Sequence, residues 1–256
     1  MDKIALCCIV KNENKYLKEY IEYYLNIGFD DIIFIDNNDT ESLDEFKSEH
    51  VIIENYRNQL CPQIRAYTEI YNKYSQNYYW IAFFDADEYL TLLKYKDVRE
   101  LLNDEKYNKF DSIRINWLMF SDNNQIYYED LPVTKRFTSS IPNTQANAHI
   151  KVIMKTNLKF VLFFNNPHYM TGNYSACNML GNKVENQNSP FEYNYYDNYE
   201  VGYLKHFYTK SCEEWLQKIN RGRADINIKR EIDDYFNYNI KTKEKEDFFS
   251  KKPSIF

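Results

Sequence analysis

Uninterrupted apolar runs alternate with amphipathic segments along the first ninety residues. Residues 4–10, 32–35 and 78–84 are apolar throughout, which is typical of strands covered on both faces of a sheet. Between these runs, apolar side chains recur every three or four residues, over residues 17–25 and again over residues 64–74. Strand and helix therefore alternate. This pattern predicts an α/β fold with a parallel, Rossmann-like sheet and a ligand crevice at the carboxyl ends of its strands.

Single residues mark the boundaries of the predicted helices. Gly28 follows the first helix, where glycine readily adopts the left-handed conformation that ends a helix, and Pro62 precedes the second. Ser211 and Glu214 have the spacing of a capping box and predict the start of a late helix. A second late helical pattern covers residues 228–236.

The second half of the chain carries shorter and more polar strand patterns. Apolar and polar side chains alternate over residues 112–120, as in a strand with one more solvent-exposed face. Residues 149–155 and 158–164 predict two further strands with a turn at Thr156 and Asn157. We find no internal repeat and no low-complexity linker, so we expect a single, two-lobed domain.

The composition limits the classes of function. A net charge of -6 without a long basic tract gives no reason to expect a nucleic-acid-binding protein. The five cysteines contain no C-x-x-C pair and predict reduced, buried thiols rather than disulfides or a zinc site. No signal peptide is recognised, and no stretch approaches the roughly 18 apolar residues of a membrane span. We expect a soluble, cytoplasmic protein.

Carboxylate-rich loops follow three of the predicted strands. They are KNEN at residues 11–14, DNNDTES at residues 36–42 and DADE at residues 85–88. Because the carboxyl ends of parallel strands meet at one edge, the three loops should converge there. Crowded carboxylates repel one another and are costly to bury unpaired, so a positive charge is expected among them. Mg²⁺ or Mn²⁺ together with substrate phosphates would supply it, and a solvated acidic turn is the alternative.

Longer segments carry a family resemblance. They are CIVKNENKYLKEYIEYYLNIGFDDIIFIDNND (residues 8–39), WIAFFDADEYL (80–90), INWLMFSDN (115–123) and LKHFYTKSCEEWLQKINRGRAD (204–225). Together they resemble the GT-A-fold glycosyltransferases, in the family-2-like and family-92-like (DUF23-related) branch. The resemblance implies a GT-A mixed sheet flanked by helices. It also implies an inverting, Mn²⁺- or Mg²⁺-dependent transfer of a hexose, galactose or glucose, from a UDP-sugar to a glycan or lipid-linked glycan in surface polysaccharide or glycoconjugate synthesis.

The same resemblance implies that successive segments of the chain have different roles. Residues 1–110 would form the nucleotide-sugar-binding half, residues 111–210 the acceptor-binding half, and residues 211–256 the carboxy-terminal helices with a charged tail. The tail carries a small excess of lysine, from which we expect peripheral contact with the inner face of an anionic membrane.

Contacts to the nucleotide are implied for the first two loops. The resemblance places Lys11, Asn12 and Glu13 beside the base, and Asp36 and Asn37 at the uridine.

Metal ligands are implied for the third loop. The resemblance makes Asp87 the main ligand of Mn²⁺ or Mg²⁺ and places Asp85 at the ribose or the metal. His206 matches a late histidine ligand of many GT-A enzymes, with a hydrogen-bonded structural histidine as the alternative. His168 has a weaker claim to the same role.

Basic residues have two interpretations each. Arg65 would reach a phosphate or pair with Glu69 one helical turn away. The late basic cluster is interpreted first as a solvated helix face and second as a group that neutralises the diphosphate; it comprises Lys210, Lys218, Arg221 and Arg223.

Acceptor and base are the least determined parts of the expected site. Trp117 and Phe120 lie where the resemblance places the acceptor, with core packing as the alternative for a strand tryptophan. The catalytic base is unresolved among Asp122, Glu88 and His168. Family members often carry Phe-Gly-Ser-x-Gly after the tryptophan strand, whereas this chain has FSDNN.

Other classes of function explain fewer of these observations. A haloacid-dehalogenase-type phosphatase would carry Thr or Val at the position of Tyr89, near the start of the chain. A nucleotidyltransferase would carry a glycine-rich phosphate loop near its amino terminus, and the first glycine is Gly28. A non-catalytic carbohydrate-binding protein would use the 25 tyrosines but would not need carboxylates at three strand ends.

Overall fold

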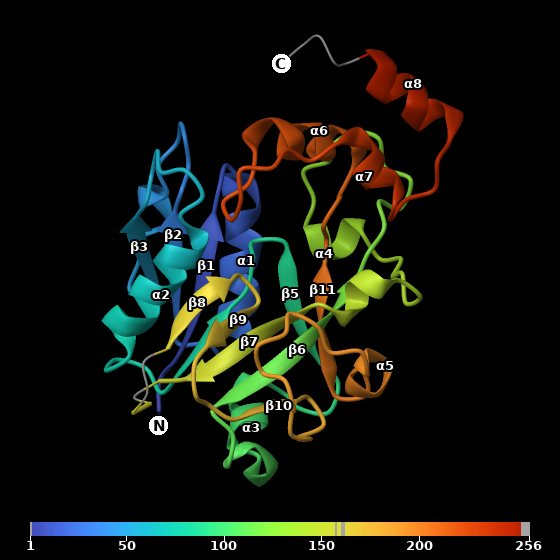
Figure 1. Ribbon diagram of the computed structural model, residues 1–256. Coiled ribbons are helices and arrows are strands. Elements are labelled where there is room, and N and C mark those ends of the chain that lie inside the picture. Colours follow the sequence, from blue (N-terminus) through green and yellow to red (C-terminus); the bar gives the residue numbers. More distant parts are fainter. Residues whose placement is uncertain (1, 157, 160–161, 252–256) are drawn as a thin grey trace.

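The fold is built on one mixed β-sheet with helices on both faces (Figure 1). The computed structural model describes residues 2–156, 158–159 and 162–251. The sheet runs in the order β3 (Val51–Asn55), β2 (Asp31–Asp36), β1 (Ile4–Val10), β4 (Trp80–Phe83), β7 (Ile150–Lys155), β6 (Ser112–Met119), β11 (Gly202–His206) and β5 (Glu88–Leu92), with β10 (Ala176–Asn178) paired to β6.

Strand directions confirm the predicted α/β class. Strands β3, β2, β1 and β4 are parallel, whereas β7 is antiparallel to both β4 and β6. Strand β11 is parallel to β6 and antiparallel to β5. The register pairs Val10 with Asp36 and Cys7 with Phe83, so the loops after β1, β2 and β4 emerge at the same edge of the sheet. This convergence is the arrangement that the sequence predicted.

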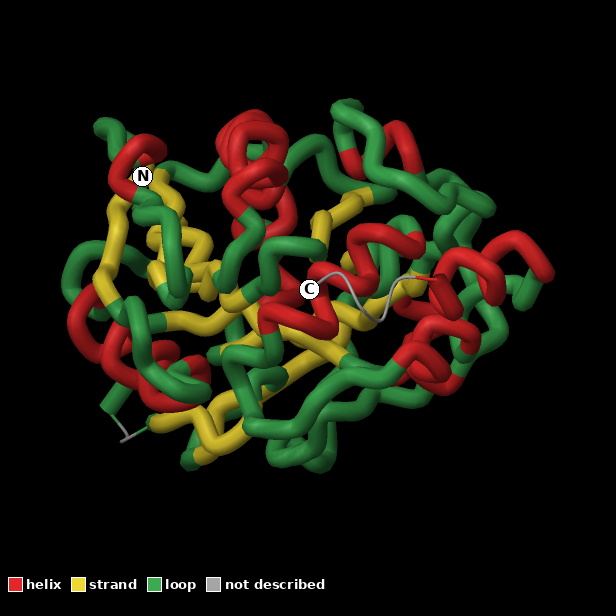
Figure 2. The backbone as a smooth tube through the Cα atoms, turned by 90° about the horizontal axis from the view of Figure 1, so that it is seen from above, coloured by secondary structure: helices red, strands yellow, loops and turns green. Residues whose placement is uncertain are grey.

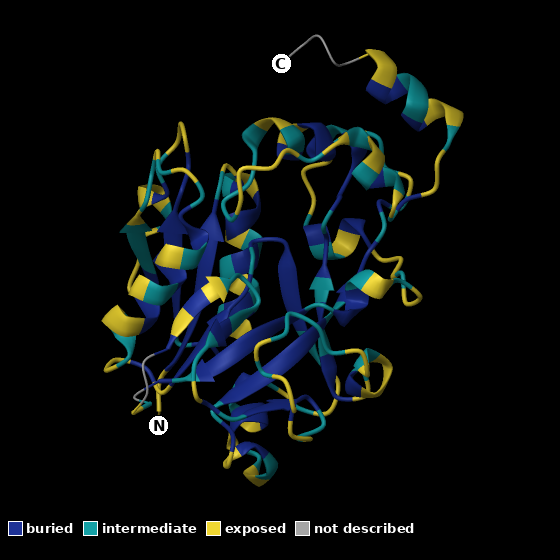
Figure 3. Cartoon of the chain, in the orientation of Figure 1, coloured by how far each residue is buried: buried dark blue, intermediate teal, exposed yellow. Residues whose placement is uncertain are grey.

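Successive side chains of β1 enter two different cores. Leu6 and Cys8 pack on the face covered by α1 (Asn14–Asn26) and α3 (Val98–Asn103), while Cys7 packs on the face covered by α2 (Gln63–Tyr74). A small hairpin, β8 (Phe163–Asn166) with β9 (Tyr169–Thr171), packs against α2 on the second face. A perpendicular view shows helices on both sides of the strands (Figure 2), and the central strands β1, β2 and β4 are wholly buried (Figure 3). Continuous apolar runs are therefore explained by two covered faces.

The predicted helix boundaries hold for the first helices. Gly28 has a φ of 102° just past α1, a conformation that strains residues with a Cβ, and Pro62 immediately precedes α2. The remaining helices are α4 (Val133–Arg136), α5 (Tyr195–Asn198), α6 (Cys212–Arg221), α7 (Ile232–Phe236) and α8 (Lys243–Lys251), with short 3₁₀ helices at Asp44–Phe46, Glu105–Tyr107 and Gln145–Ala148.

Several predicted elements differ in extent from those observed. Helix α7 is shorter than the predicted pattern, because Ile228 lies outside it and is exposed. The predicted strand at residues 158–164 is replaced by β8, which begins at Phe163; Asn157 and residues 160–161 lie outside the described residues. All five cysteines are free thiols, as expected, and four are buried, but Cys61 is only partly buried. Among the described helices, none combines the length and the apolar character needed to cross a bilayer.

The carboxy-terminal helices form a third apolar core with their own polar anchor. Trp215 on α6, Tyr235 on α7 and Phe249 on α8 are buried together. Asp122 lies under this cluster, where its carboxylate accepts a hydrogen bond from the Tyr235 hydroxyl at 2.5 Å and pairs with Lys245 of α8 at 2.5 Å. Asp122 therefore anchors the tail helix and does not line the pocket described below. Residues 252–256 of the expected membrane-binding tail lie outside the described residues.

Glu214 fastens α6 to the amino-terminal half. The predicted capping box is present, with the Ser211 hydroxyl donating to Glu214 at 2.5 Å. The same carboxylate accepts a hydrogen bond from the Tyr16 hydroxyl of α1 at 2.5 Å and pairs with the buried Arg136 guanidinium of α4 at 2.5 Å. Burial alone would raise the pKa of Glu214, but Arg136 and the other hydrogen-bond donors lower it to about 2.

This depressed pKa predicts how stability changes with pH. The contribution of the Glu214 carboxylate to the free energy of unfolding is complete above its unfolded pKa of 4.5 and is lost as the pH falls through about 2. We expect Glu214→Gln to cost about 3 kcal/mol at pH 7, because Arg136 stays buried without its partner. Urea unfolding of both proteins should show the difference shrinking below pH 4.5.

The matched control is Glu244→Gln, which changes an exposed carboxylate on α8. It should show no such pH-dependent difference. A Glu214→Gln deficit of equal size at pH 7 and pH 2.5 would contradict the role of the ionised carboxylate.

Candidate functional site

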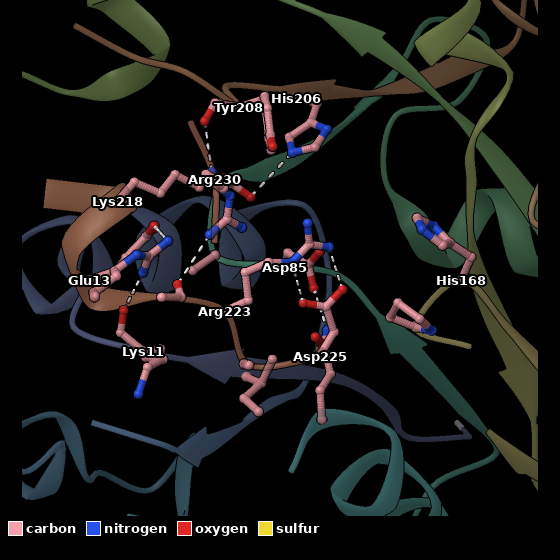
Figure 4. Close-up of a pocket in the computed structure, with 18 of the residues that line it drawn as sticks. Lys11, Glu13, Asp85, His168, His206, Tyr208, Lys218, Arg223, Asp225 and Arg230 are labelled. Atoms are coloured by element: carbon pink, nitrogen blue, oxygen red, sulfur yellow. Dashed lines mark hydrogen bonds and ion pairs between the residues drawn. The ribbon is translucent and has the colours of Figure 1, made fainter. Parts of the chain in front are cut away.

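A pocket lies at the carboxyl edge of β1 and β4, beneath α6 and the segment that follows it (Figure 4). Loops after β1 and β4 supply most of its acidic side chains, β6 and β11 supply aromatic ones, and the carboxy-terminal region supplies most of the basic ones. The lining side chains used below are Lys11, Glu13, Asp85, Asp87, Trp117, His168, His206, Lys218, Arg221, Arg223, Asp225 and Arg230.

A tight turn between β4 and β5 positions the two aspartates. The backbone N–H of Glu88 donates to the carbonyl of Asp85 at 3.0 Å, and the N–H of Asp85 donates to the Glu88 carboxylate at 2.9 Å. Glu88 is fully buried behind this turn and is not among the lining residues. Burial raises the pKa of Glu88 well above its usual value, and Lys151 offsets only part of that rise. Glu88 therefore shapes the turn and is not placed to contact an acceptor.

Lys151 neutralises the first aspartate from inside the sheet. It lies on β7, is completely buried, and its Nζ is 2.8 Å from Asp85 Oδ2 and 3.8 Å from Glu88 Oε1. The other oxygen of Asp85 accepts hydrogen bonds from Gln63 at 3.0 Å and from the Tyr67 hydroxyl at 3.2 Å. Burial lowers the pKa of Lys151, but Asp85 and Glu88 raise it above its usual value overall. The ammonium is therefore a permanent charge beneath the site.

Lys218 neutralises the second aspartate from α6. Its Nζ is 2.6 Å from Asp87 Oδ2, and His206 Nε2 is 3.5 Å from Asp87 Oδ1. Lys218 also donates to the carbonyl of Tyr208 at 2.7 Å, and its Nζ lies 4.4 Å from the centre of that ring. Burial would raise the pKa of Asp87, but Lys218 and His206 hold it well below its usual value.

Glu13 joins the first loop to α6. Its carboxylate pairs with Arg221 at 2.5 Å and with Lys210 at 3.3 Å, and Arg221 also donates to the carbonyl of Lys11. Burial would raise the pKa of Glu13, but Arg221 and Lys210 lower it overall. These contacts correct the interpretation of the late basic cluster as a solvated helix face, because Lys210 and Lys218 are only 4% and 6% exposed.

The segment after α6 closes one side of the pocket. Its backbone is held against α2 by a hydrogen bond from Gln63 N–H to the Ala224 carbonyl at 3.1 Å. Arg223 pairs with Asp225 at 2.6 Å, and Arg230 donates to the Gly222 carbonyl at 3.1 Å. Taken together, the lining contains more basic than acidic side chains; the basic ones are Lys11, Lys218, Arg221, Arg223 and Arg230, and the acidic ones are Glu13, Asp85, Asp87 and Asp225.

The opposite wall is aromatic and carries a neutral histidine. The ring of Trp117 lies 4.2 Å from His206 and 5.2 Å from His168, centre to centre. His168 Nδ1 is 2.9 Å from the carbonyl of Ile150, so Nδ1 carries the proton and Nε2 keeps its lone pair. Burial lowers the pKa of His168 well below its usual value and lowers that of His206. Phe120 is in the core beside Phe207 and does not line the pocket.

Residues of the second loop are brought to the same edge but not to this pocket. Asp36 is 1% exposed, and its oxygens accept from the N–H groups of Asn38 and Leu43 at 3.0 and 3.1 Å. The Asn37 amide donates to two backbone carbonyls at 2.9 Å. These side chains hold the loop in shape.

Asn12 and Arg65, which were also expected to contact the nucleotide, do not line this pocket. Asn12, with a φ of 52°, borders a smaller adjoining pocket and bonds through its N–H to Asn38 at 2.5 Å. Arg65 is exposed and pairs with Glu69 at 3.4 Å, the alternative interpretation given above.

The geometry does not fit the expected divalent metal. Within the part of the chain that the structure describes, no group of three histidine, cysteine, aspartate or glutamate side chains converges as metal ligands. Both oxygens of Asp85 already have partners, and Asp87 is in contact with an ammonium. A cation bound to Asp87 Oδ2 would have to displace Lys218, while Oδ1 faces His206 Nε2 at 3.5 Å. We therefore derive no chemical step through a metal.

Sequence reasoning missed several residues of the pocket. Lys151 lies in HIKVIMK, a strand whose other central residues are buried and apolar, and a lysine in such a strand signals a buried acidic partner. No sequence pattern distinguishes the other missed residues from surface residues; they are Gln63, Asp225 and Arg230.

Comparisons with known proteins add little. No family model matches the sequence, and no curated protein matches it. Among solved structures, a crystal structure of GalNAc-T7 with UDP, GalNAc and Mn²⁺ is similar over 48% of this chain and 24% of that chain, at 12% identity and a TM-score of 0.31. That likeness is too slight to carry a functional conclusion. The resemblance to family-2-like and family-92-like enzymes stays a prediction.

The ion pair between the buried Lys151 and the partly exposed Asp85 yields a stability prediction. Lys151→Met leaves Asp85 and the buried Glu88 without their counter-charge and should lower the free energy of unfolding by about 3–5 kcal/mol. Lys155→Met on the same strand removes a lysine that bonds to a loop carbonyl, and it should cost less than about 1 kcal/mol. Urea unfolding measures both. Equal losses would show that Lys151 does not stabilise the turn.

Proposed function

We propose that this protein is a glycosyltransferase that moves a hexose from a UDP-sugar to a glycan or lipid-linked glycan. The observation that carries the proposal is the pairing of an Asp-x-Asp turn, at the carboxyl edge of a parallel sheet, with a basic wall from α6 and the segment after it. Ligands of open α/β sheets bind at this edge. An excess of guanidinium and ammonium groups over carboxylates favours a ligand that carries two phosphates.

In the proposed reaction the acceptor hydroxyl attacks the anomeric carbon of the donor. The bond between that carbon and the phosphate oxygen breaks, and UDP leaves with the bonding electrons. A base takes the hydroxyl proton as the new glycosidic bond forms. The basic wall stabilises the charge that develops on the diphosphate, and this stabilisation needs no reorganisation because the side chains are already held in place.

His168 is the best supported base of the three expected candidates. It lines the pocket beside Trp117, whereas Asp122 and Glu88 are buried elsewhere. Its Nε2 has a lone pair, and its lowered pKa keeps the ring neutral at pH 7. Trp117 provides an apolar face beside it, against which a sugar ring can stack.

A non-catalytic carbohydrate-binding role has less support. Such a protein presents aromatic side chains on its surface at its binding site. The exposed tyrosines Tyr79, Tyr127, Tyr193 and Tyr196 do not line the pocket, and others are packed in the cores, namely Tyr16, Tyr20, Tyr24, Tyr67 and Tyr71. The phosphatase alternative would need an aspartate with a free nucleophilic oxygen, and both oxygens of Asp85 accept hydrogen bonds or pair with Lys151.

Nucleotide protection tests the donor. We expect UDP to raise the melting temperature more than UMP does, because the second phosphate meets the basic wall, and more than GDP or CMP does. Differential scanning fluorimetry measures these shifts. Stronger protection by GDP or CMP would contradict uridine recognition.

Transfer kinetics test the base. His168→Ala should lower kcat by about 10²-fold or more while UDP protects the variant as well as the parent. His50→Ala changes an exposed histidine just before β3, at the opposite edge of the sheet from the pocket, and should leave kcat unchanged. UDP release from UDP-galactose or UDP-glucose with a glycan acceptor gives the rate. A kcat retained within threefold in His168→Ala would exclude this base.

A further inference from the structure

Lys218 stands where a divalent cation would be expected. It contacts Asp87, the aspartate that the family resemblance makes the main metal ligand, and both side chains are almost completely buried. Its position is fixed from two further directions, by the Tyr208 carbonyl and by the Tyr208 ring. Two of the three N–H groups of the ammonium are thus engaged, by Asp87 and by the carbonyl. Among the described residues no acceptor oxygen contacts the third N–H, and Lys218 lines the pocket.

Arg230 adds a second positive charge that the described residues leave without a carboxylate. Its guanidinium lines the same pocket, 5.8 Å from the Tyr208 ring. The contact recorded for it is with the carbonyl of Gly222, and its Nε is buried without a hydrogen-bond partner among the described residues. Figure 4 shows Tyr208, Lys218 and Arg230 on one side of the pocket and His168 on the other. The buried Lys218 ammonium and the partly buried Arg230 guanidinium repel each other unless an anion joins them.

A divalent cation and these two basic side chains compete for the same place. A metal bound to Asp87 Oδ2 would lie within a few ångströms of the Lys218 ammonium, and charges of like sign at such distances are strongly unfavourable in a poorly solvated site. To make room at Oδ2, Lys218 would have to give up its contact with Asp87. Asp85 offers no compensation, because Lys151, Gln63 and Tyr67 already occupy its oxygens.

We propose that Lys218 and Arg230 take the place of a divalent metal, so that this protein binds nucleoside diphosphates without Mn²⁺ or Mg²⁺. This inference rests on the proposed function and specifies its cation. Asp87 then serves to hold the Lys218 ammonium in position. The Lys218 ammonium and the Arg230 guanidinium donate to the diphosphate, and they stabilise its charge as the bond to the sugar breaks.

Calorimetric titration with UDP, in EDTA and again in Mn²⁺, tests the inference on the full chain. We expect the two dissociation constants to agree within about twofold. Lys218→Met and Arg230→Met should each weaken UDP binding by about tenfold or more in EDTA, the loss expected for one charge-assisted hydrogen bond. Lys229→Met, which removes an exposed charge next to Arg230 in sequence, should change the dissociation constant by less than twofold.

Asp87→Asn separates the two accounts most sharply. If Asp87 only holds Lys218, the variant keeps UDP binding in EDTA or binds more tightly, because the ammonium loses its competing carboxylate. If Asp87 is a metal ligand, the variant loses UDP binding. Lys218→Met leaves Asp87 buried and unpaired, and this variant can unfold for that reason alone. If circular dichroism shows unfolding, the double variant Lys218→Met with Asp87→Asn takes its place. The double variant should also bind UDP at least about tenfold more weakly than the parent.

The outcomes distinguish this inference from the function on which it rests. UDP binding that requires Mn²⁺ and disappears in Asp87→Asn overturns the metal-free site and leaves the UDP-sugar proposal standing. UDP that binds in neither buffer, to a protein that is folded, overturns both.

Discussion

Neutralisation of buried carboxylates at the edge of the parallel strands is the constraint on which the rest of this structure depends. Asp85, Asp87 and Glu13 follow strands whose faces are both covered, so each loses much of its hydration. An unpaired carboxylate in such surroundings is costly. Each acquires a cation from a part of the chain far away in sequence: Lys151 from β7, Lys218 from α6 and Arg221 from the end of α6.

These pairs build the fold and the pocket at once. Lys151 on the antiparallel strand β7 pairs with Asp85 after the parallel strand β4. Lys218 and Arg221 hold α6 over the carboxyl edge of the parallel strands. The Glu214 anchor to Tyr16 and Arg136 sets the position of α6 independently. Because α6 is fixed at both ends, its basic side chains line the pocket and do not extend into bulk solvent. A site assembled in this way is ready for an anionic ligand before that ligand arrives.

Sequence reasoning succeeded where the signal is local and failed where it depends on distant partners. Strand β1, helix α1 and the α6 capping box follow from neighbouring residues, as does the convergence of the acidic loops. The half-exposed edge strand β3 lacks a long apolar run and went unpredicted. Asp122 resembles a catalytic acid in sequence, but its partner is Lys245, more than a hundred residues later. A positive charge was expected beside the aspartates, and one is present beside each. It comes from Lys151 and Lys218, and residue spacing in the sequence does not reveal that these distant lysines are the partners.

A crystal structure of the protein grown with UDP and Mn²⁺, with anomalous data collected at the manganese edge, tests the central claim most directly. The account predicts diphosphate oxygens within hydrogen-bonding distance of Lys218 and Arg230, Lys218 still paired with Asp87, and no anomalous peak between Asp87 and the phosphates. A manganese peak bound to Asp87 and His206, with Lys218 displaced, would contradict it.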